Sequence, residues 1–118
     1  MRAASAFADQ TGDIAVIIQS KSDPDLSIAV NAEKPMPSAS LIKAAIACAA
    51  AQGEVDLKTP VAISALDDTF YCSIIQAFES DDQITLRALI GLMLIVSDNP
   101  ATTAVLDAIG MDKVNAWL

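Results

Sequence analysis

Ser40 and Lys43 are spaced so that, on a helix, their side chains lie on one face with Cβ atoms about 5–6 Å apart. Lys43 is the only charged residue between Lys34 and Glu54, and its neighbours are Leu, Ile and Ala. Loss of hydration in such surroundings disfavours a charged ammonium, and a neutral amine beside a hydroxyl can act as its general base. The spacing therefore predicts Ser40 as an activated nucleophile and Lys43 as its base. If Ser40 lies in the first turn of its helix, the nearby backbone N–H groups suit a developing oxyanion.

A second polar cluster, Ser97-Asp98-Asn99, follows the most apolar stretch of the chain and precedes Pro100. Each pattern has an ordinary explanation when taken alone. A lysine on an Ala-rich helix commonly extends its amine to solvent, and Ser, Asp and Asn favour helix caps. Two such patterns 57 residues apart favour one shared site over two unrelated helix ends.

The composition excludes several other kinds of site. The chain has no histidine, so it cannot assemble a Ser-His-Asp triad, a Cys-His pair or a His-bearing zinc site. Cys48 and Cys72 are too far apart in sequence for a zinc or redox motif. The net charge of −8 and the sequence pI near 4.1 argue against a nucleic-acid partner. We expect no metal ion and no cofactor.

The size and apolar content suit one domain or part of a larger one. The chain has 118 residues, of which 53% are hydrophobic and only 4% aromatic, a composition that fits closely packed helices and excludes disorder. The longest apolar runs, Ala44–Ala51 and Ala88–Val96, have 8 and 9 residues, whereas a membrane span needs about 20. Residues 1–9 lack the apolar segment of an export signal, so we expect no such signal within this chain.

The first part of the chain is predicted to form a β-hairpin. Ile14–Gln19 is rich in β-branched residues, and Leu26–Asn31 alternates apolar with small or polar ones. Residues 20–25 between them carry strong turn chemistry. Residues 32–37 contain two prolines and are predicted to connect the hairpin to the rest.

The remainder is predicted to be mainly helical. We expect a helix over residues 38–52 ending at Gly53 as the C′ residue, and a helix over Leu86–Ser97 that begins at an N-cap Thr85. The second of these is apolar on nearly every side, which predicts burial all round. The smaller predicted pieces are an extended or irregular segment Lys58–Ser64 around Pro60, a short helix Ser73–Glu79 and a loop at 81–83. Two further helices are predicted over Ala101–Ile109, closed by Gly110, and over Lys113–Leu118, begun near Asp112.

One hairpin followed by about five helical pieces is an unusual order for an independent domain. A two-stranded sheet is marginal alone in water. We therefore expect an α+β fold with residues 1–35 forming an N-terminal helix and the hairpin, and residues 36–118 forming the helical part that carries both motifs. Further strands are expected to pack against the hairpin and are not encoded in these residues.

The two motifs resemble part of the signature of class A β-lactamases and penicillin-binding proteins, Ser-x-x-Lys, Ser-Asp-Asn and Lys-Thr-Gly. The likeness extends beyond them. Residues 37–43 are similar to the nucleophile segment of the family, residues 84–89 and 93–102 to its second segment, residues 106–118 to the helices that follow, and residues 14–30 to its opening hairpin. The resemblance thus covers nearly the whole chain and implies a β-lactamase/transpeptidase-like fold.

The resemblance also implies roles for individual residues. Ser40 would be the acylated nucleophile, with its own N–H as one oxyanion donor, and Lys43 would activate it. Ser97 would relay a proton to the leaving nitrogen, and Asn99 would hold the substrate amide and the Lys43 side chain. Asp98 would be structural. Tyr71 lies near the family's aromatic residue at the mouth of the site, although Cys72 could occupy that position instead.

The sequence departs from the family pattern at three places. The only Lys-Thr pair, Lys58-Thr59, precedes Ser-Asp-Asn, so the Lys-Thr-Gly motif is missing, and no glutamate follows Ser-Asp-Asn to serve as the deacylating base. The cysteine pair that some members form would fall at Ala47 and Ile90. Cys48 and Cys72 are therefore expected to be free thiols or an unrelated pair.

Three functional hypotheses follow from these residues. The first is a class A β-lactamase-type serine hydrolase represented by its N-terminal portion, with a β-lactam as substrate. The second is a D-Ala-D-Ala carboxypeptidase or another serine hydrolase of the same fold, acting on an acyl-D-Ala-D-Ala-like substrate. The third is an inactive truncated fragment that forms a homodimer or pairs with a complementary C-terminal fragment. A periplasmic or secreted location is implied by the resemblance.

Overall fold

The computed structural model describes residues 12–23, 25–53, 55–66 and 73–118. The chain divides into two compact units, Met1–Pro37 and Ser38–Leu118. The helix expected near the N-terminus lies outside the described residues. Among the described residues, no helix has the length and apolar character required to cross a membrane.

The first unit contains the predicted hairpin. Strands β1 (Val16–Gln19) and β2 (Ser27–Val30) pair in antiparallel register, with Val16 opposite Val30. The turn chemistry predicted for residues 20–25 is confirmed, because the Ser20 hydroxyl accepts from the Asp23 N–H and the Asp23 carboxylate accepts from the Asp25 N–H. Side-chain alternation places four β-branched residues on one face of the hairpin: Val16, Ile18, Ile28 and Val30.

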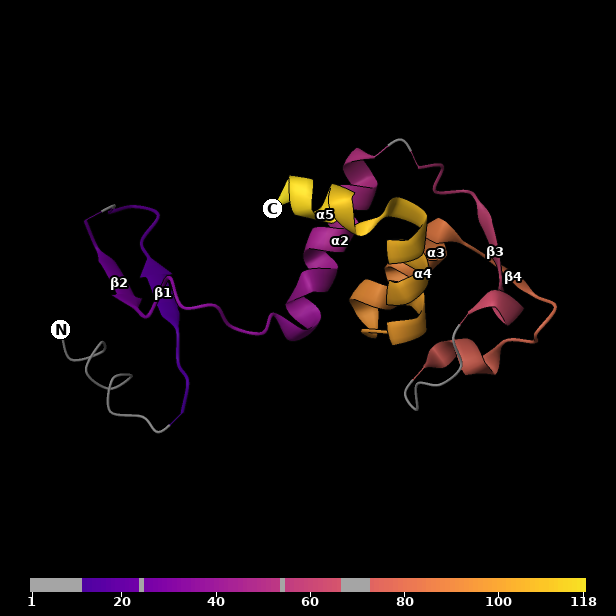
Figure 1. Ribbon diagram of the computed structural model, residues 1–118, viewed down its shortest axis with the longest axis horizontal. Helices are drawn as coiled ribbons and strands as arrows, with labels where there is room; N and C mark the ends of the chain where they lie inside the picture. The colour runs from indigo at the N-terminus through magenta and orange to yellow at the C-terminus, as the bar shows by residue number, and fades with distance from the viewer. Residues whose placement is uncertain (1–11, 24, 54, 67–72) are drawn as a thin grey trace. The chain divides into compact units, whose positions relative to one another are not determined.

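The second unit is a cluster of four helices, α2 (Ile42–Gln52), α3 (Leu86–Ile95), α4 (Asn99–Ile109) and α5 (Met111–Trp117). Helix α4 packs against α2 and α3, and α5 packs against α2 and α4 (Figure 1). Three short 3-10 turns accompany them: η1 (Ala39–Leu41), η2 (Ile63–Ala65) and η3 (Ile74–Ala77).

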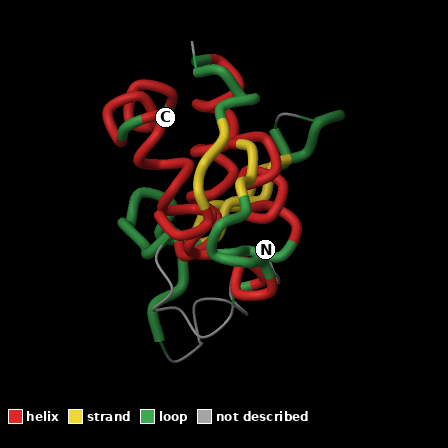
Figure 2. Tube along the Cα trace, turned by 90° about the vertical axis from the view of Figure 1, so that its right-hand side faces the viewer, coloured by secondary structure: helices red, strands yellow, loops and turns green. Residues whose placement is uncertain are grey.

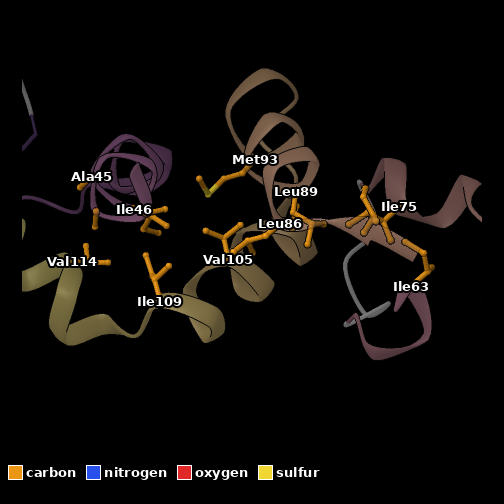
Figure 3. Packing of buried hydrophobic residues seen from close by; sticks show 14 residues of the cluster. Ala45, Ile46, Ile63, Ile75, Leu86, Leu89, Met93, Val105, Ile109 and Val114 are labelled. Carbon is orange, nitrogen blue, oxygen red and sulfur yellow. The ribbon is translucent and has the colours of Figure 1, made fainter. Parts of the chain in front are cut away.

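The core of this unit is made of aliphatic side chains from all four helices. Ile46 of α2 faces Ile109 and Val114, while Leu89 and Met93 of α3 lie beside Val105 of α4 (Figure 3). Each of these residues is at most 4% exposed. Burying such side chains contributes roughly 1.5–3 kcal/mol each relative to leaving them in water. The core thus fixes the ends of α2, α3 and α4 relative to one another.

A second sheet, which the sequence analysis did not predict as a pair, lies beside the helices. Strand β3 (Pro60–Ala62) pairs with β4 (Gln83–Thr85) in antiparallel register, with Val61 opposite Ile84 (Figures 1 and 2). The extended or irregular conformation predicted for Lys58–Ser64 is confirmed at Pro60–Ala62, whereas its last two residues lie in the 3-10 turn η2. The loop predicted at residues 81–83 is wrong at Gln83, which is the first residue of β4. Its partner comes from a segment more than 20 residues earlier, so no local sequence pattern indicates the pairing.

Helix ends follow the predicted chemistry in most places. The Thr85 side chain accepts from the Ala88 N–H at the start of α3, and Gly110 ends α4 with a φ of +82°. The prediction for Gly53 is wrong. Gly53 follows α2 in an extended conformation, with φ −80° and ψ 166°, and so does not form the left-handed cap that favours glycine.

The composition of α3 predicted burial on every side, and this prediction is wrong. Leu86, Leu89 and Met93 are buried, but Ile95 is 84% exposed and its neighbours Leu94 and Val96 are about half exposed. The N-cap Thr85 and the apolar run after it identified the helix correctly. The described residues cover only one face of its C-terminal end.

Candidate active site

Ser40 lies in η1, immediately before α2 rather than in the first turn of that helix as predicted. Its side chain is exposed, and the preceding residue, Ala39, has a φ of +44°. Helix α2 begins at Ile42, so Lys43 lies in its first turn and is 6% exposed. The left-handed backbone at Ala39 and the start of α2 together place an exposed hydroxyl close to a buried amine.

Ser97-Asp98-Asn99 forms the corner between α3 and α4. Ser97 has a φ of +59°, Asp98 is the N-cap of α4, and Asn99 is the first residue of that helix. Backbone N–H groups of Val96 and Asp98 both donate to the Leu92 carbonyl, which closes the end of α3. The predicted helix over Leu86–Ser97 therefore ends two residues earlier, at Ile95, and Ser97 turns the chain into α4.

Hydrogen bonds join the corner to Ser40 and Lys43. The Ser40 and Ser97 hydroxyls are 3.0 Å apart. The Lys43 amine donates to the Ser97 hydroxyl at 2.8 Å, to the Ser97 carbonyl at 2.6 Å and to Asn99 Oδ1 at 2.8 Å. The four residues lie in one network, although they come from segments more than 50 residues apart.

The Ser97 hydroxyl lies between Ser40 and Lys43 in this network. The motifs predict the Lys43 amine against the Ser40 hydroxyl, with the Ser97 hydroxyl facing both. The described hydrogen bonds instead connect Ser40 and Lys43 through Ser97. The Ser97 carbonyl and Asn99 Oδ1 can only accept, so they take two amine hydrogens in either protonation state. The third position of the amine faces Ser97 Oγ, where an ammonium donates and a neutral amine accepts. This arrangement can pass a proton from Ser40 through Ser97 to Lys43 and back.

Asp98 is 1% exposed, and its carboxylate bonds to groups outside this network. Its Oδ2 accepts from the Ser73 hydroxyl at 2.8 Å and from the Ile74 N–H at 2.9 Å, and its Oδ1 accepts from the Ala101 N–H at 2.9 Å. Burial of a carboxylate is costly unless it is hydrogen-bonded, and here three neutral donors satisfy it. These contacts tie the corner to α4 and to the segment that begins η3.

The other candidate residues have different outcomes. Tyr71 and Cys72 lie outside the described residues, so the role proposed at the mouth of the site stays a prediction. Cys48 is an exposed free thiol on α2. Over residues 12–23, 25–53, 55–66 and 73–118, no group of three or more Cys, Asp or Glu residues is placed to hold a metal ion, and no carboxylate lies within salt-bridge distance of Lys43.

Ser73 is the residue of this site that the sequence analysis missed as a functional candidate. It was predicted only as the start of a short helix over Ser73–Glu79. In the structure this helix is the 3-10 turn η3, and Ser73 is its N-cap. Its bond to Asp98 spans 25 positions and leaves no local pattern in the sequence. Only the fold brings it to the corner.

Comparison with known proteins supports a single family. The model of the beta-lactamase enzyme family matches residues 2–118, which is nearly the whole chain. The chain belongs to the beta-lactamase enzyme family. A search of curated proteins found no match.

Two solved structures share the fold of this family member. One is the beta-lactamase from Sphaerobacter thermophilus DSM 20745, with a TM-score of 0.80 and 24% identity, and the other is PBP-A, with a TM-score of 0.76 and 22% identity. Each comparison covers 98% of this chain but only 44% and 45%, respectively, of the other chain. The α+β, beta-lactamase-like fold predicted from the motifs is confirmed, and the chain spans less than half the length of these two structures.

Proposed function

We propose that this member of the beta-lactamase family is a serine hydrolase of the class A type, which opens a β-lactam amide through an acyl intermediate on Ser40. The observation that carries the proposal is the Ser40–Ser97–Lys43 hydrogen-bond chain. It pairs an exposed hydroxyl with a buried amine through a second hydroxyl, with bonds of 3.0 and 2.8 Å. No histidine is needed for this chemistry.

In the acylation step, Ser40 gives its proton to Ser97 while Ser97 gives its own proton to the neutral amine of Lys43. Ser40 Oγ attacks the lactam carbonyl carbon and forms an ester as the carbon–nitrogen bond breaks. The proton then returns from Lys43 through Ser97 to the leaving nitrogen, so atoms and charge balance. The Ser40 N–H is proposed to stabilise the oxyanion, as the family resemblance implies.

Asn99 is proposed to have two roles in this step. Its Oδ1 accepts from Lys43 and so fixes the orientation of the side-chain amide. This leaves Nδ2 as the group that would donate to an amide carbonyl of the substrate. The same bond also links substrate recognition to the position of the amine.

A D-Ala-D-Ala carboxypeptidase or penicillin-binding activity is the second candidate, because both activities share the acylation step. They differ in how fast water removes the acyl group from Ser40. A long-lived acyl-Ser40 would favour the second candidate, and rapid release would favour the first.

The test uses a chromogenic cephalosporin and the protein at its natural full length. We expect hydrolysis, or a stoichiometric burst, in the parent and in Ser38→Ala, and neither in Ser40→Ala. Ser38 is a suitable control because it is exposed, lies two residues before Ser40 and makes no side-chain cap bond. Equal reaction by Ser40→Ala and the parent would refute the proposal. The deacylation rate from a penicilloyl adduct then separates the two candidate activities.

We also propose a periplasmic or secreted location, on the strength of family membership alone. Association with a second copy or with a complementary fragment is proposed from the exposed end of α3, where Leu94, Ile95 and Val96 are all at least 49% exposed. Cell fractionation tests the first proposal. Light scattering of the purified protein tests the second, and a monomer at high concentration would refute self-association.

A further inference from the structure

We infer that Ser73 is a positioning residue for the active site, which acts through the Asp98 carboxylate on Ser97 and Asn99. The kinetic part of this inference rests on the proposed function. Ser73 does not touch the Ser40–Ser97–Lys43 chain in the described hydrogen bonds. Its influence would pass through one buried carboxylate to the residues on either side of it.

The Ser73 hydroxyl is fixed by two bonds. It donates to Asp98 Oδ2 at 2.8 Å and accepts from the Ile75 N–H at 3.2 Å. An ionised carboxylate can only accept, so the single hydroxyl hydrogen must point toward Asp98. Hydrogen bonds to a charged acceptor are stronger than neutral ones, and this one is partly buried. Ser73 therefore orients the carboxylate while its own segment is held by the cap at η3.

Asp98 passes this constraint to its two neighbours. Ser97 has a left-handed backbone, with φ +59°, which a residue other than glycine keeps only where its surroundings hold it. That conformation directs both the carbonyl and the hydroxyl of Ser97 to the Lys43 amine. On the other side, Asp98 caps α4 at Ala101 and so places Asn99 in the first turn. A carboxylate that is free to rotate would loosen the hydrogen bonds of Ser97 and Asn99 with Lys43.

The matched variants are Ser73→Thr and Ser73→Val. Threonine and valine have nearly the same shape, and the extended backbone of Ser73, with φ −127° and ψ 130°, accommodates both. Only threonine keeps the hydroxyl. Ser73→Ala is the smaller variant to use if valine prevents folding, and Ser80→Ala replaces an exposed serine outside the network.

The first measurement is independent of activity. In ¹H–¹⁵N NMR spectra of the full chain, we expect the amide signals of Ser97 and Asn99 to move in the Val and Ala variants but to stay near the parent positions in the Thr and Ser80→Ala variants. Signals that stay in place in the Val and Ala variants, or that move equally in the Thr and Val variants, would overturn the inference. This result does not depend on whether Ser40 is acylated.

The second measurement is the acylation of Ser40 by a fluorescent penicillin, with the rate constant separated from the binding constant. We expect the Val variant to acylate at least tenfold more slowly with little change in binding, within the ~100-fold loss that a displacement of about 1 Å can cause. The Thr variant should restore the parent rate. A loss of binding with an unchanged rate constant would contradict the positioning role. A parent protein that is not acylated, with amide signals that move as expected, would refute the proposed function while supporting the structural link.

Discussion

The turn that carries the proposed nucleophile, residues 38–43 (the nucleophile turn), and the polar corner, residues 97–99, meet in one hydrogen-bond network but are held in place differently. The corner has a buried carboxylate that accepts from three donors on two other segments. In the nucleophile turn, Ser40 is exposed, and within the described part of the chain its hydroxyl hydrogen-bonds to the Ser97 hydroxyl. The comparison indicates that the corner is the more firmly held of the two regions, while the turn presents the exposed Ser40 hydroxyl to it.

Both regions contain strained backbone. Three non-glycine residues among those described have a positive φ, and two of them, Ala39 and Ser97, belong to the site. The third is Asn31, a residue type that tolerates this conformation. Each left-handed alanine or serine costs roughly 1–2 kcal/mol. The core must compensate for this cost, and strain of this kind is typical of functional sites.

The largest expected effect comes from the one buried amine shared by both regions. Lys43→Met keeps the apolar stem but removes the hydrogen bonds to Ser97 and Asn99, so we expect acylation of Ser40 to slow by about 10³-fold, within the range of a lost general base. Stopped-flow acylation with a reporter cephalosporin measures this. Lys58→Met, at an exposed lysine, is the control, and equal rates in the two variants would show that the amine is not the base.

The next largest effect is a difference in the free energy of unfolding between a variant of the polar corner and a variant of the nucleophile turn. Asp98→Ala leaves three donors without their acceptor, and we expect it to lower the free energy of unfolding by about 2–4 kcal/mol. Ser40→Ala removes one exposed bond and should cost less than about 1 kcal/mol. Urea denaturation compares them, with the exposed Asp107→Ala as control. Similar losses for Asp98→Ala and Ser40→Ala would remove the proposed difference between corner and turn.

The smallest effect concerns the strain at Ala39. Ala39→Gly relieves the left-handed backbone but increases the entropy of the unfolded chain, so we expect a net stabilisation of about 0.5 kcal/mol. Ala44→Gly, at an exposed position inside α2, should instead destabilise by about 1 kcal/mol. Thermal or urea unfolding of both variants gives the comparison. Equal destabilisation would mean that the turn at Ala39 is not strained in solution.

The sequence predicted those parts of the fold that depend on local chemistry. The turn at residues 20–25, the N-cap Thr85 and the positive φ at Gly110 all follow from residue types at particular positions. Strands β3 and β4 were harder to predict because each has only three residues and its pairing is not local. Gly53 shows the same limit, since its extended conformation depends on the path to the next segment.

The sequence also predicted which residues form the site, but not how they are bonded to one another. The two motifs identified Ser40, Lys43, Ser97 and Asn99, and the fold brings all four together. What the motifs could not give is the order of the bonds, with Ser97 between Ser40 and the Lys43 amine. That order depends on the left-handed backbone of Ser97, and this in turn depends on Asp98 and Ser73. Contacts between segments, rather than residue types, determine it.

Mass spectrometry of the protein after brief exposure to benzylpenicillin tests the central claim most directly. The account predicts one penicilloyl group, located by peptide mapping on Ser40, in the parent and in Ser38→Ala, and no adduct in Ser40→Ala. An adduct that persists in Ser40→Ala, or that maps to another residue of the parent, would contradict the assignment of Ser40 as the nucleophile.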